Sequence, residues 1–134
     1  MTKKPPIPIN IGLDIVDISR FAGFDDRVQQ LANHRLAKIF TKREIVYCFK
    51  FKEPSSHLAG IFAAKEATSK ALGVKKFPFI EIEVRHGKDG EPQIWHNNKK
   101  LPVKVSISHT DTVAAAVALA YNENDEKMPR IGSR

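Results

Sequence analysis

The chain has 134 residues, 42% of them hydrophobic and 28% charged, with a net charge of +7, which indicates a folded protein that favours an anionic partner. This length predicts a single domain over residues 1–121, followed by a polar C-terminal tail over residues 122–134. The single cysteine excludes an intrachain disulfide, and no apolar run is long enough for a membrane span, so we expect a soluble, cytoplasmic protein with no membrane partner.

The N-terminal segment alternates between apolar and polar residues, which predicts a β-strand over residues 7–16 with Asp14 near its end. Apolar residues then recur at helical spacing, which predicts a first helix over residues 18–31. Arg20 and Arg27 fall on the opposite side of this helix. The first helix is therefore expected to have a basic outer surface.

Capping signals mark the next two helices. Residues 41–44, Thr-Lys-Arg-Glu, have the form of a capping box, so we expect a short helix to follow them. A longer helix is expected from about residue 56 to residue 72, with Ser55 or Ser56 as its N-cap and Gly73 as its C-terminal stop.

The rest of the chain has the two-residue period of strands. Residues 80–85 alternate, and the Asp-Gly pair at 89–90 predicts a hairpin. Residues 103–108 alternate again, whereas the apolar run at 113–121 fits a strand or a short helix, and its position after a short turn favours a strand. The pattern predicts an α+β fold, a small antiparallel sheet packed with helices.

Glu66 and Lys70 are the first candidates for chemistry. They lie one turn apart on the predicted long helix, with the glutamate nearer the N-terminus, which is the favourable order for a surface ion pair worth about 0.2 to 0.5 kcal/mol. That ordinary ion pair is one interpretation. The other is a binding site, because small residues beside the pair leave room for a bulky group: Ala59, Ala63, Ala64 and Ala67.

Asp14 and His109 each have two interpretations as well. A carboxylate at a strand end can ligate a hard cation such as Mg²⁺, or it can cap the turn that follows. His109 ends the strand that carries Ser106 and Ser108 on one face, and it serves either in a site or as a surface residue. The residues alone leave both choices open.

Four stretches, in this order, resemble the signature blocks of a known family: IGLDIVDISRF, FTKREIVYC, LAGIFAAKEATSKALG and VSISHTDTVAAAVA. Through them the chain is similar to holo-acyl-carrier-protein synthase, the small bacterial 4′-phosphopantetheinyl transferase. The resemblance implies the fold of that family, with one long helix carrying an active-site glutamate and lysine. It also implies transfer of 4′-phosphopantetheine from coenzyme A to a serine of apo-acyl carrier protein, in support of fatty acid biosynthesis.

The resemblance assigns roles to residues. Asp14, Glu66 and Lys70 would be catalytic, with Asp14 and Glu66 as ligands of Mg²⁺, or of Mn²⁺ as the alternative ion, and Lys70 on the pyrophosphate. The serine proton would pass to metal-bound water or hydroxide, or to a carboxylate such as Glu66. Lys65 would brace Asp14 or a phosphate, or extend along the helix surface. The expected coenzyme A contacts are Lys70, His109, Ser69 and Arg43.

Acyl carrier proteins are acidic beside the target serine, so this partner accounts for the positive net charge. The resemblance places the contacts to the carrier protein on the first helix, at Arg20, Phe21, Phe24 and Arg27. It also implies a homotrimer with an active site at each subunit interface, in which the apolar run at 113–120 packs against a neighbouring subunit.

The chain departs from the family pattern at two places. Ile61 stands where many relatives have an arginine, which removes one expected contact to the 3′-phosphate of coenzyme A; Lys50, Lys52 or Arg43 would compensate. Residues 74–76, Val-Lys-Lys, replace a stretch that relatives often begin with Thr-Gly. Both changes concern coenzyme A binding and leave the expected metal ligands intact.

The alternative function is a nucleic-acid-binding module, which the basic charge suggests. Against it, the basic residues are scattered over several predicted elements, and the aromatic residues do not interleave with them as a stacking platform requires. We therefore expect no nucleic acid partner.

Overall fold

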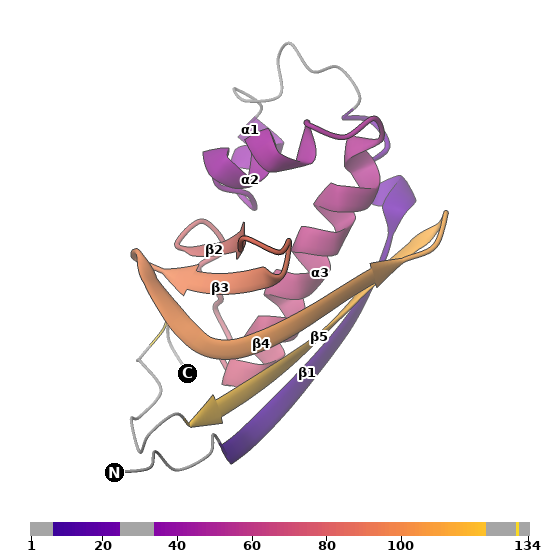
Figure 1. Ribbon diagram of the computed structural model, residues 1–134. Coiled ribbons are helices and arrows are strands. Elements are labelled where there is room, and N and C mark those ends of the chain that lie inside the picture. The colour runs from indigo at the N-terminus through magenta and orange to yellow at the C-terminus, as the bar shows by residue number, and fades with distance from the viewer. Residues whose placement is uncertain (1–6, 25–33, 123–130, 132–134) are drawn as a thin grey trace.

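The computed structural model describes residues 7–24, 34–122 and 131, and these form a five-stranded sheet with a long helix (Figure 1). The strands are β1 (Ile7–Asp17), β2 (Ile82–His86), β3 (Pro92–His96), β4 (Lys99–His109) and β5 (Val113–Asn122). The helices are the 3₁₀ helix η1 (Ile18–Phe21), α1 (His34–Ala37), α2 (Lys42–Cys48) and α3 (Pro54–Leu72). Within the described ranges, no helix has the length and apolarity needed to cross a membrane.

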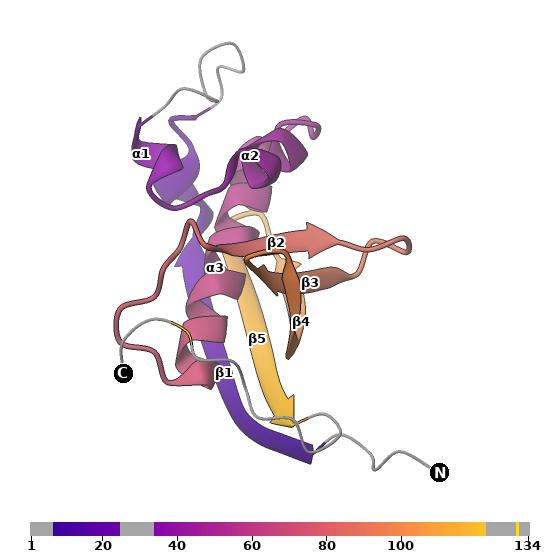
Figure 2. The same ribbon diagram turned by 90° about the vertical axis from the view of Figure 1, so that its left-hand side faces the viewer.

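The strands follow the order β1-β5-β4-β3-β2, and every neighbouring pair is antiparallel. α3 runs along the long strands β1, β5 and β4, with α1 and α2 near the end where it begins (Figure 1, Figure 2). The predicted hairpin is β2–β3, with Gly90 at φ 84°, while Asn97 and Asn98 turn the chain from β3 into β4 with φ 49° and 64°. Gly and Asn tolerate this left-handed region, which lets the turns close. The α+β prediction is confirmed.

Small residues let α3 approach the sheet closely. Gly12 of β1 has no room for a side chain, because a Cβ there would meet the carbonyl oxygen of Ala67 and lie within 2.8 Å of the Ala71 nitrogen. Alternate residues of β5 are buried alanines that pack beneath α3: Ala114, Ala116, Ala118 and Ala120. The backbone of the helix is therefore held almost against the backbone of β1.

The side of β1 that faces away from α3 is apolar. Its five large aliphatic residues are between 48% and 64% exposed, and Val117 of the neighbouring β5 is also exposed. We call this surface the outer face, and it consists of Ile7, Ile9, Ile11, Leu13, Ile15 and Val117. In β1 the alternation therefore places Gly12, Asp14 and the buried Val16 on the helix side and the large aliphatic residues of the outer face at the surface.

The predicted first helix is wrong where the structure describes it. η1 ends at Phe21, and Ala22 closes a 3₁₀-type turn by donating its amide to the Ser19 carbonyl oxygen. Ile18, Phe21 and Phe24 are all buried. Their three-residue spacing suits the three residues per turn of a 3₁₀ helix, which explains the confusion with an α-helix. Residues 25–33 of the predicted helix lie outside the described residues.

The predicted helix ends are partly correct. The capping box is confirmed, with Thr41 Oγ1 accepting the Glu44 amide and Glu44 Oε1 accepting the Thr41 amide. Gly73 ends α3 in the left-handed conformation, as predicted. The predicted serine N-cap is wrong, because α3 begins with Pro54, two residues before the predicted start at about residue 56. Proline suits the first helical position, and the N-cap is Glu53.

At the C-terminus, two residues of the predicted polar tail, Asn122 and Ile131, belong to the folded structure. The strand prediction for residues 113–121 is confirmed, and β5 continues through Asn122. Ile131 is buried with the core residues. The other residues of the predicted tail lie outside the described residues.

Candidate active site

Asp14 and Lys70 meet where β1 crosses the C-terminal half of α3. The Lys70 Nζ lies 3.3 Å from Asp14 Oδ1 and donates a 2.9 Å hydrogen bond to the Leu13 carbonyl oxygen. The Asp14 side chain is 17% exposed and that of Lys70 is 53% exposed, so solvent reaches the pair. Among the ion pairs of the described residues, Lys70 joins Asp14 on the strand and not Glu66 on its own helix. The interpretation as an ordinary Glu66–Lys70 pair is therefore wrong.

Glu66 is half-buried beside this pair. Burial raises the pKa of the Glu66 carboxyl and the nearby Asp14 charge raises it further, while Lys70 and Arg20 act in the opposite direction. Two carboxyl groups whose charges repel each other favour either a proton on one of them or a cation between them. We call the place where Asp14, Glu66 and Lys70 meet the carboxylate seam.

The carboxylate seam fits a hard cation better than a zinc ion. Among the described residues, no group of three or more His, Cys, Asp or Glu could hold a metal ion. A structural zinc site needs such a group, whereas Mg²⁺ takes one or two carboxylates and fills its shell with water and substrate phosphates. Asp14 and Glu66, whose mutual repulsion a cation would relieve, have the donor chemistry for Mg²⁺ or Mn²⁺.

Two further residues predicted to contact coenzyme A lie in different surroundings. Ser69 is next to Lys70 on α3, but its Oγ donates a 2.8 Å hydrogen bond to the Glu66 carbonyl oxygen. Arg43 lies on α2, where its Nε is 3.6 Å from Glu83 Oε1. The structure therefore brings Ser69 next to the carboxylate seam and holds Arg43 beside an acidic partner on β2.

Lys65 points away from the carboxylate seam into the protein. Its side chain is fully buried, and its Nζ lies 2.6 Å from Glu44 Oε1. The same ammonium donates hydrogen bonds of 2.7 Å to the Ile39 carbonyl oxygen and 2.6 Å to the Phe79 carbonyl oxygen. These contacts occupy all three N–H donors. Lys65 therefore neither braces Asp14 nor extends along the helix surface, and both interpretations are wrong.

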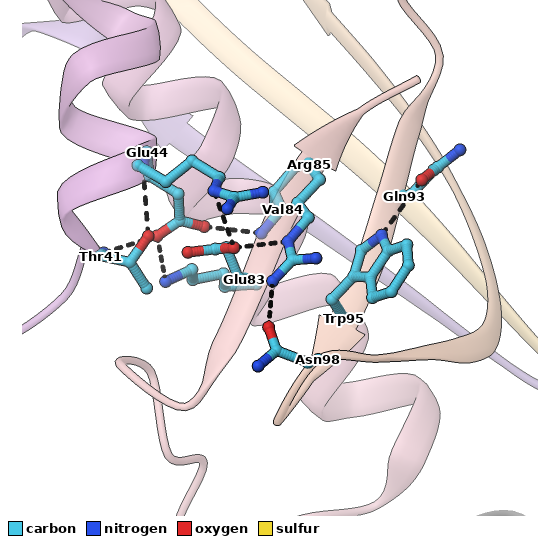
Figure 3. Close-up of polar contacts among 10 residues, drawn as sticks. Thr41, Glu44, Glu83, Val84, Arg85, Gln93, Trp95 and Asn98 are labelled. Atoms are coloured by element: carbon cyan, nitrogen blue, oxygen red, sulfur yellow. Dashed lines mark hydrogen bonds and ion pairs between the residues drawn. The ribbon is translucent and has the colours of Figure 1, made fainter. Parts of the chain in front are cut away.

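Glu44, the partner of Lys65, is fully buried as well and joins three elements. Its Oε1 accepts the Thr41 amide at 2.8 Å, and its Oε2 accepts the Val84 amide of β2 at 2.7 Å (Figure 3). Sequence reasoning recognised Glu44 only as a capping residue. Its second role could not be read from the local pattern, because Val84 lies forty residues further along the chain.

A second polar network fixes the β2–β3 hairpin. Arg85 Nε donates to Glu83 Oε1 at 2.6 Å, and Arg85 also donates to Asn98 Oδ1 at 2.8 Å (Figure 3). The Arg85 guanidinium lies 4.4 Å from the centroid of the Trp95 ring, whose Nε1 donates to Gln93. Because these charges are already paired, the network is a structural feature of the hairpin and not a candidate site.

His109 lines a cavity of about 220 Å³, which we call the histidine cavity. The ring of Tyr47 stacks on His86 at 3.8 Å, and His57 meets the His109 ring edge-on at 6.1 Å. His57 is also stacked on Phe51 at 3.6 Å. The cavity thus presents flat rings and ring nitrogens together. Its main lining residues are Tyr47, His57, Ile61, His86, Ile107 and His109.

Two histidines of the histidine cavity, His57 and His86, have lowered pKa values. Burial lowers the pKa of His57, and the neighbouring His109 lowers it further. Burial also lowers the pKa of His86, with His57 and Lys50 acting in the same direction and Glu91 opposing them. A bound anion would reverse these effects by stabilising the imidazolium forms.

Sequence reasoning missed the residues that complete this cavity. His57 lies one helical turn before Ile61, so the two side chains share one side of α3, a spacing that is visible in the sequence. Tyr47 and His86 gave no such signal, because α2 and β2 are brought together only by the fold.

The carboxylate seam and the histidine cavity lie on opposite sides of α3. His57 and Glu66 are nine residues apart, or about two and a half turns, so their side chains point in opposite directions. None of Asp14, Glu66 and Lys70 lines the histidine cavity. One copy of the chain therefore holds the predicted site residues in two separate groups, with His109 in one and the carboxylates in the other.

The residues predicted to contact a carrier protein line a third feature, a groove of about 200 Å³ that we call the basic groove. Phe21 and Phe24 are only 3% and 8% exposed, so they form its apolar wall and also belong to the core. Arg27 lies outside the described residues. The charged residues that line the groove are Arg20, Arg35 and Lys38, two of which sequence reasoning did not include.

The sequence matches the 4′-phosphopantetheinyl transferase superfamily over residues 10–121. The holo-[acyl-carrier-protein] synthase of Carboxydothermus hydrogenoformans is 39% identical over 122 residues, covering 84% of this chain and 97% of that protein. The holo-[acyl-carrier-protein] synthase of Caldanaerobacter subterraneus subsp. tengcongensis is 35% identical over 123 residues, covering 84% of this chain and 94% of that protein.

Solved structures agree with the sequence comparison. The holo-(acyl-carrier-protein) synthase of Bacillus anthracis, in complex with CoA (3′,5′-ADP), superposes with a TM-score of 0.68 at 30% identity, covering 86% of this chain and 97% of that one. The Helicobacter pylori holo-[acyl-carrier-protein] synthase, in complex with coenzyme A, gives 0.66 at 32% identity, covering 84% and 99%. The matched region includes the carboxylate seam and the histidine cavity, and the chain belongs to the 4′-phosphopantetheinyl transferase superfamily.

Proposed function

We propose that the chain is a holo-acyl-carrier-protein synthase. It transfers the 4′-phosphopantetheine group of coenzyme A to a serine of apo-acyl carrier protein and releases adenosine 3′,5′-bisphosphate, in the cytoplasm and in support of fatty acid biosynthesis. The observation that carries this proposal is the meeting of Asp14, Glu66 and Lys70 at one solvent-accessible seam in a chain of this superfamily.

The transfer makes one phosphorus–oxygen bond and breaks another, and the serine hydroxyl gives up its proton to a water molecule or to a carboxylate such as Glu66. The serine oxygen bonds to the phosphorus that carries pantetheine, and the bond from that phosphorus to the oxygen of the adenosine-bearing phosphate breaks, so negative charge moves to the leaving group. Asp14 and Glu66 would hold a Mg²⁺ ion, which supplies positive charge beside the pyrophosphate. Lys70 uses two N–H donors on Leu13 and Asp14, which leaves the third for a phosphate oxygen.

The histidine cavity would bind the 3′-phosphoadenosine end of coenzyme A. Flat rings of Tyr47 and the histidines suit stacking on adenine, and the imidazoles can bind a phosphate once they are protonated. Lys50, whose Nζ lies 5.9 Å from the centroid of the Tyr47 ring, adds a permanent positive charge nearby. His57 and Lys50 would therefore supply the charge that Ile61 lacks.

A complete site requires two copies of the chain, because the carboxylate seam and the histidine cavity lie on opposite sides of α3. Pairing the seam of one subunit with the cavity of the next is a head-to-tail contact, and such contacts form a ring when the rotation between neighbouring subunits closes. The exposed apolar outer face of β1 gives the subunits a surface to bury. We propose that the ring is a homotrimer with one active site at each interface.

The basic groove would receive the acidic carrier protein. Arg20 links the basic groove with the carboxylate seam, because it lines the groove and its charge also acts on Glu66. A carrier held by Arg20 and Lys38 would therefore have its serine close to the carboxylate seam. Charge complementarity of this kind mainly speeds association.

The proposal is tested by incubating the protein with Mg²⁺, coenzyme A and an apo-carrier protein, and weighing the carrier by mass spectrometry. We expect a mass gain of one phosphopantetheine group that EDTA abolishes and excess Mg²⁺ restores. Glu66→Ala should lower the rate by roughly a hundredfold or more. Glu81→Ala, which removes an exposed glutamate outside the seam, is the matched control. Carriers of several types that all keep their mass would refute the proposed function.

A further inference from the structure

Lys65 and Glu44 form a buried ion pair that the proposed chemistry does not use. Both side chains are fully buried, and their charged atoms are 2.6 Å apart. Removing two charges from water is costly, and an apolar pair of similar volume is often as stable or more stable. Stability alone therefore does not explain why this protein has a buried ion pair at this place.

The contacts of Lys65 connect α3 with three other segments. Its Nζ binds Glu44 of α2, the Ile39 carbonyl oxygen after α1 and the Phe79 carbonyl oxygen before β2. Glu44 extends the connection to β2 through the Val84 amide. One side chain of α3 is thus fixed from several directions by short, charge-assisted hydrogen bonds, which depend strongly on direction.

On its sheet side α3 is held by close packing and by one exposed side chain. The helix rests there on Gly12 of β1 and on buried alanines along β5. Lys70, whose side chain is 53% exposed, bonds to the Leu13 carbonyl oxygen and to Asp14. The packing sets how closely the helix and sheet approach, but apolar contact is not directional, and the Lys70 ion pair is weakened by solvent. Glu66 directly follows Lys65, about 100° around the helix, so whatever fixes Lys65 also fixes the direction of Glu66.

We propose that Lys65 and Glu44 are a positioning pair, which sets the rotation of α3 about its axis and so holds Glu66 opposite Asp14. The pair touches neither substrate nor metal and acts through Glu66. Since Ile39 also lines the basic groove, the same pair links the groove to the carboxylate seam. The role given to Glu66 rests on the proposed function, whereas the control of its direction is a property of the fold.

The test uses the full-length protein with both charges removed together. Lys65→Met alone leaves Glu44 charged and buried, and that variant is expected to unfold easily. The double variant Glu44→Gln/Lys65→Met leaves no unpaired charge, so we expect its urea midpoint to recover most of the loss. Thr68→Val is the matched control, because Thr68 is buried on the same helix but bonds only to the Ala64 carbonyl oxygen within that helix.

Two measurements separate positioning from stability. Mn²⁺ affinity is measured by electron paramagnetic resonance in the presence of coenzyme A, and kcat and KM are measured by the mass assay. We expect the double variant to lose roughly ten- to a hundredfold in Mn²⁺ affinity and in kcat, as when groups that orient a metal ligand are removed. Thr68→Val should match the wild-type protein in both.

A double variant with the Mn²⁺ affinity and kcat of Thr68→Val would overturn the positioning role. Wild-type protein that binds no Mn²⁺ would overturn it as well. Wild-type protein that binds Mn²⁺ but transfers no group would refute the proposed function alone, and in that case a loss of Mn²⁺ affinity in the double variant would still support the positioning pair.

Discussion

Gly12→Ala tests whether the close approach of β1 to α3 builds the carboxylate seam. The new methyl group would meet the Ala67 carbonyl oxygen and lie 2.8 Å from the Ala71 nitrogen, both of which are backbone atoms that cannot turn aside. Strand and helix would have to separate by roughly 1 Å to admit it. Because Asp14 lies on the same side of β1, this separation also moves it away from Glu66.

The expected magnitudes differ for stability and for activity. Overpacking of this kind costs about 2 to 3 kcal/mol of unfolding free energy, which a domain with roughly 5 to 15 kcal/mol of stability can survive. At a urea slope of about 2 kcal/mol per M, the unfolding midpoint falls by about 1 M or slightly more. A displacement of about 1 Å at the reacting groups lowers the rate by roughly a hundredfold.

Urea unfolding followed by circular dichroism gives the unfolding midpoint, and the carrier mass assay gives kcat/KM. Gly23→Ala is the matched control, because a Cβ at Gly23 meets no atom within 4 Å. We expect it to behave as the wild-type protein does. If Gly12→Ala kept both the wild-type midpoint and the wild-type rate, the argument from close approach would be refuted.

Three further predictions concern the groove, the cavity and the outer face. Lys38→Glu should raise KM for the carrier by roughly five- to tenfold at low salt and less at high salt, with Lys88→Glu on the β2–β3 turn unchanged; equal effects of both variants would contradict a specific groove. Burial lowers the pKa of His57 below its ordinary value of 6.5, so as pH falls through about 6.5 the unfolded chain takes up its proton first and the unfolding free energy falls. Urea midpoints between about pH 8 and about pH 5.5 should therefore decline less for His57→Gln, and an equal decline would count against the buried neutral ring. Ile11→Lys should dissociate the assembly and abolish transfer, whereas Val46→Lys, at an equally exposed site on α2, should not; sedimentation velocity distinguishes them, and a monomeric wild-type protein would disprove the trimer.

The sequence predicts the structure correctly where that structure depends on residues that are neighbours along the chain. The capping box at Thr41 and Glu44, the left-handed stop at Gly73 and the turn at Gly90 were all predicted, because each follows from a few residues and from backbone preferences. Family resemblance then selected Asp14 and Glu66. In the structure the charge of Asp14 raises the pKa of Glu66, while the roles of both residues stay predictions for the experiments above.

Other predictions from the sequence are wrong, and the structure shows why. The three-residue spacing of apolar residues from Ile18 predicts an α-helix, although it also fits the 3₁₀ turn that the structure has. The sequence predicts Lys65 beside Asp14, beside a phosphate or along the helix surface, because no residue next to it indicates the partner Glu44, twenty-one residues earlier. Two of the three histidines that line the cavity, His57 and His86, are likewise brought together only by packing.

Local periodicity, capping and motif are enough to predict the order and type of most elements, the fold class and the residues that identify the superfamily. Three other features follow from the packing of distant segments: the large aliphatic residues from Ile7 to Ile15 face outward, Lys65 is buried against Glu44, and His109 and Glu66 lie on opposite sides of α3. No local pattern predicts them, because hydrophobic burial and charge pairing depend on which surfaces meet, and in this chain those surfaces come from segments far apart in the sequence.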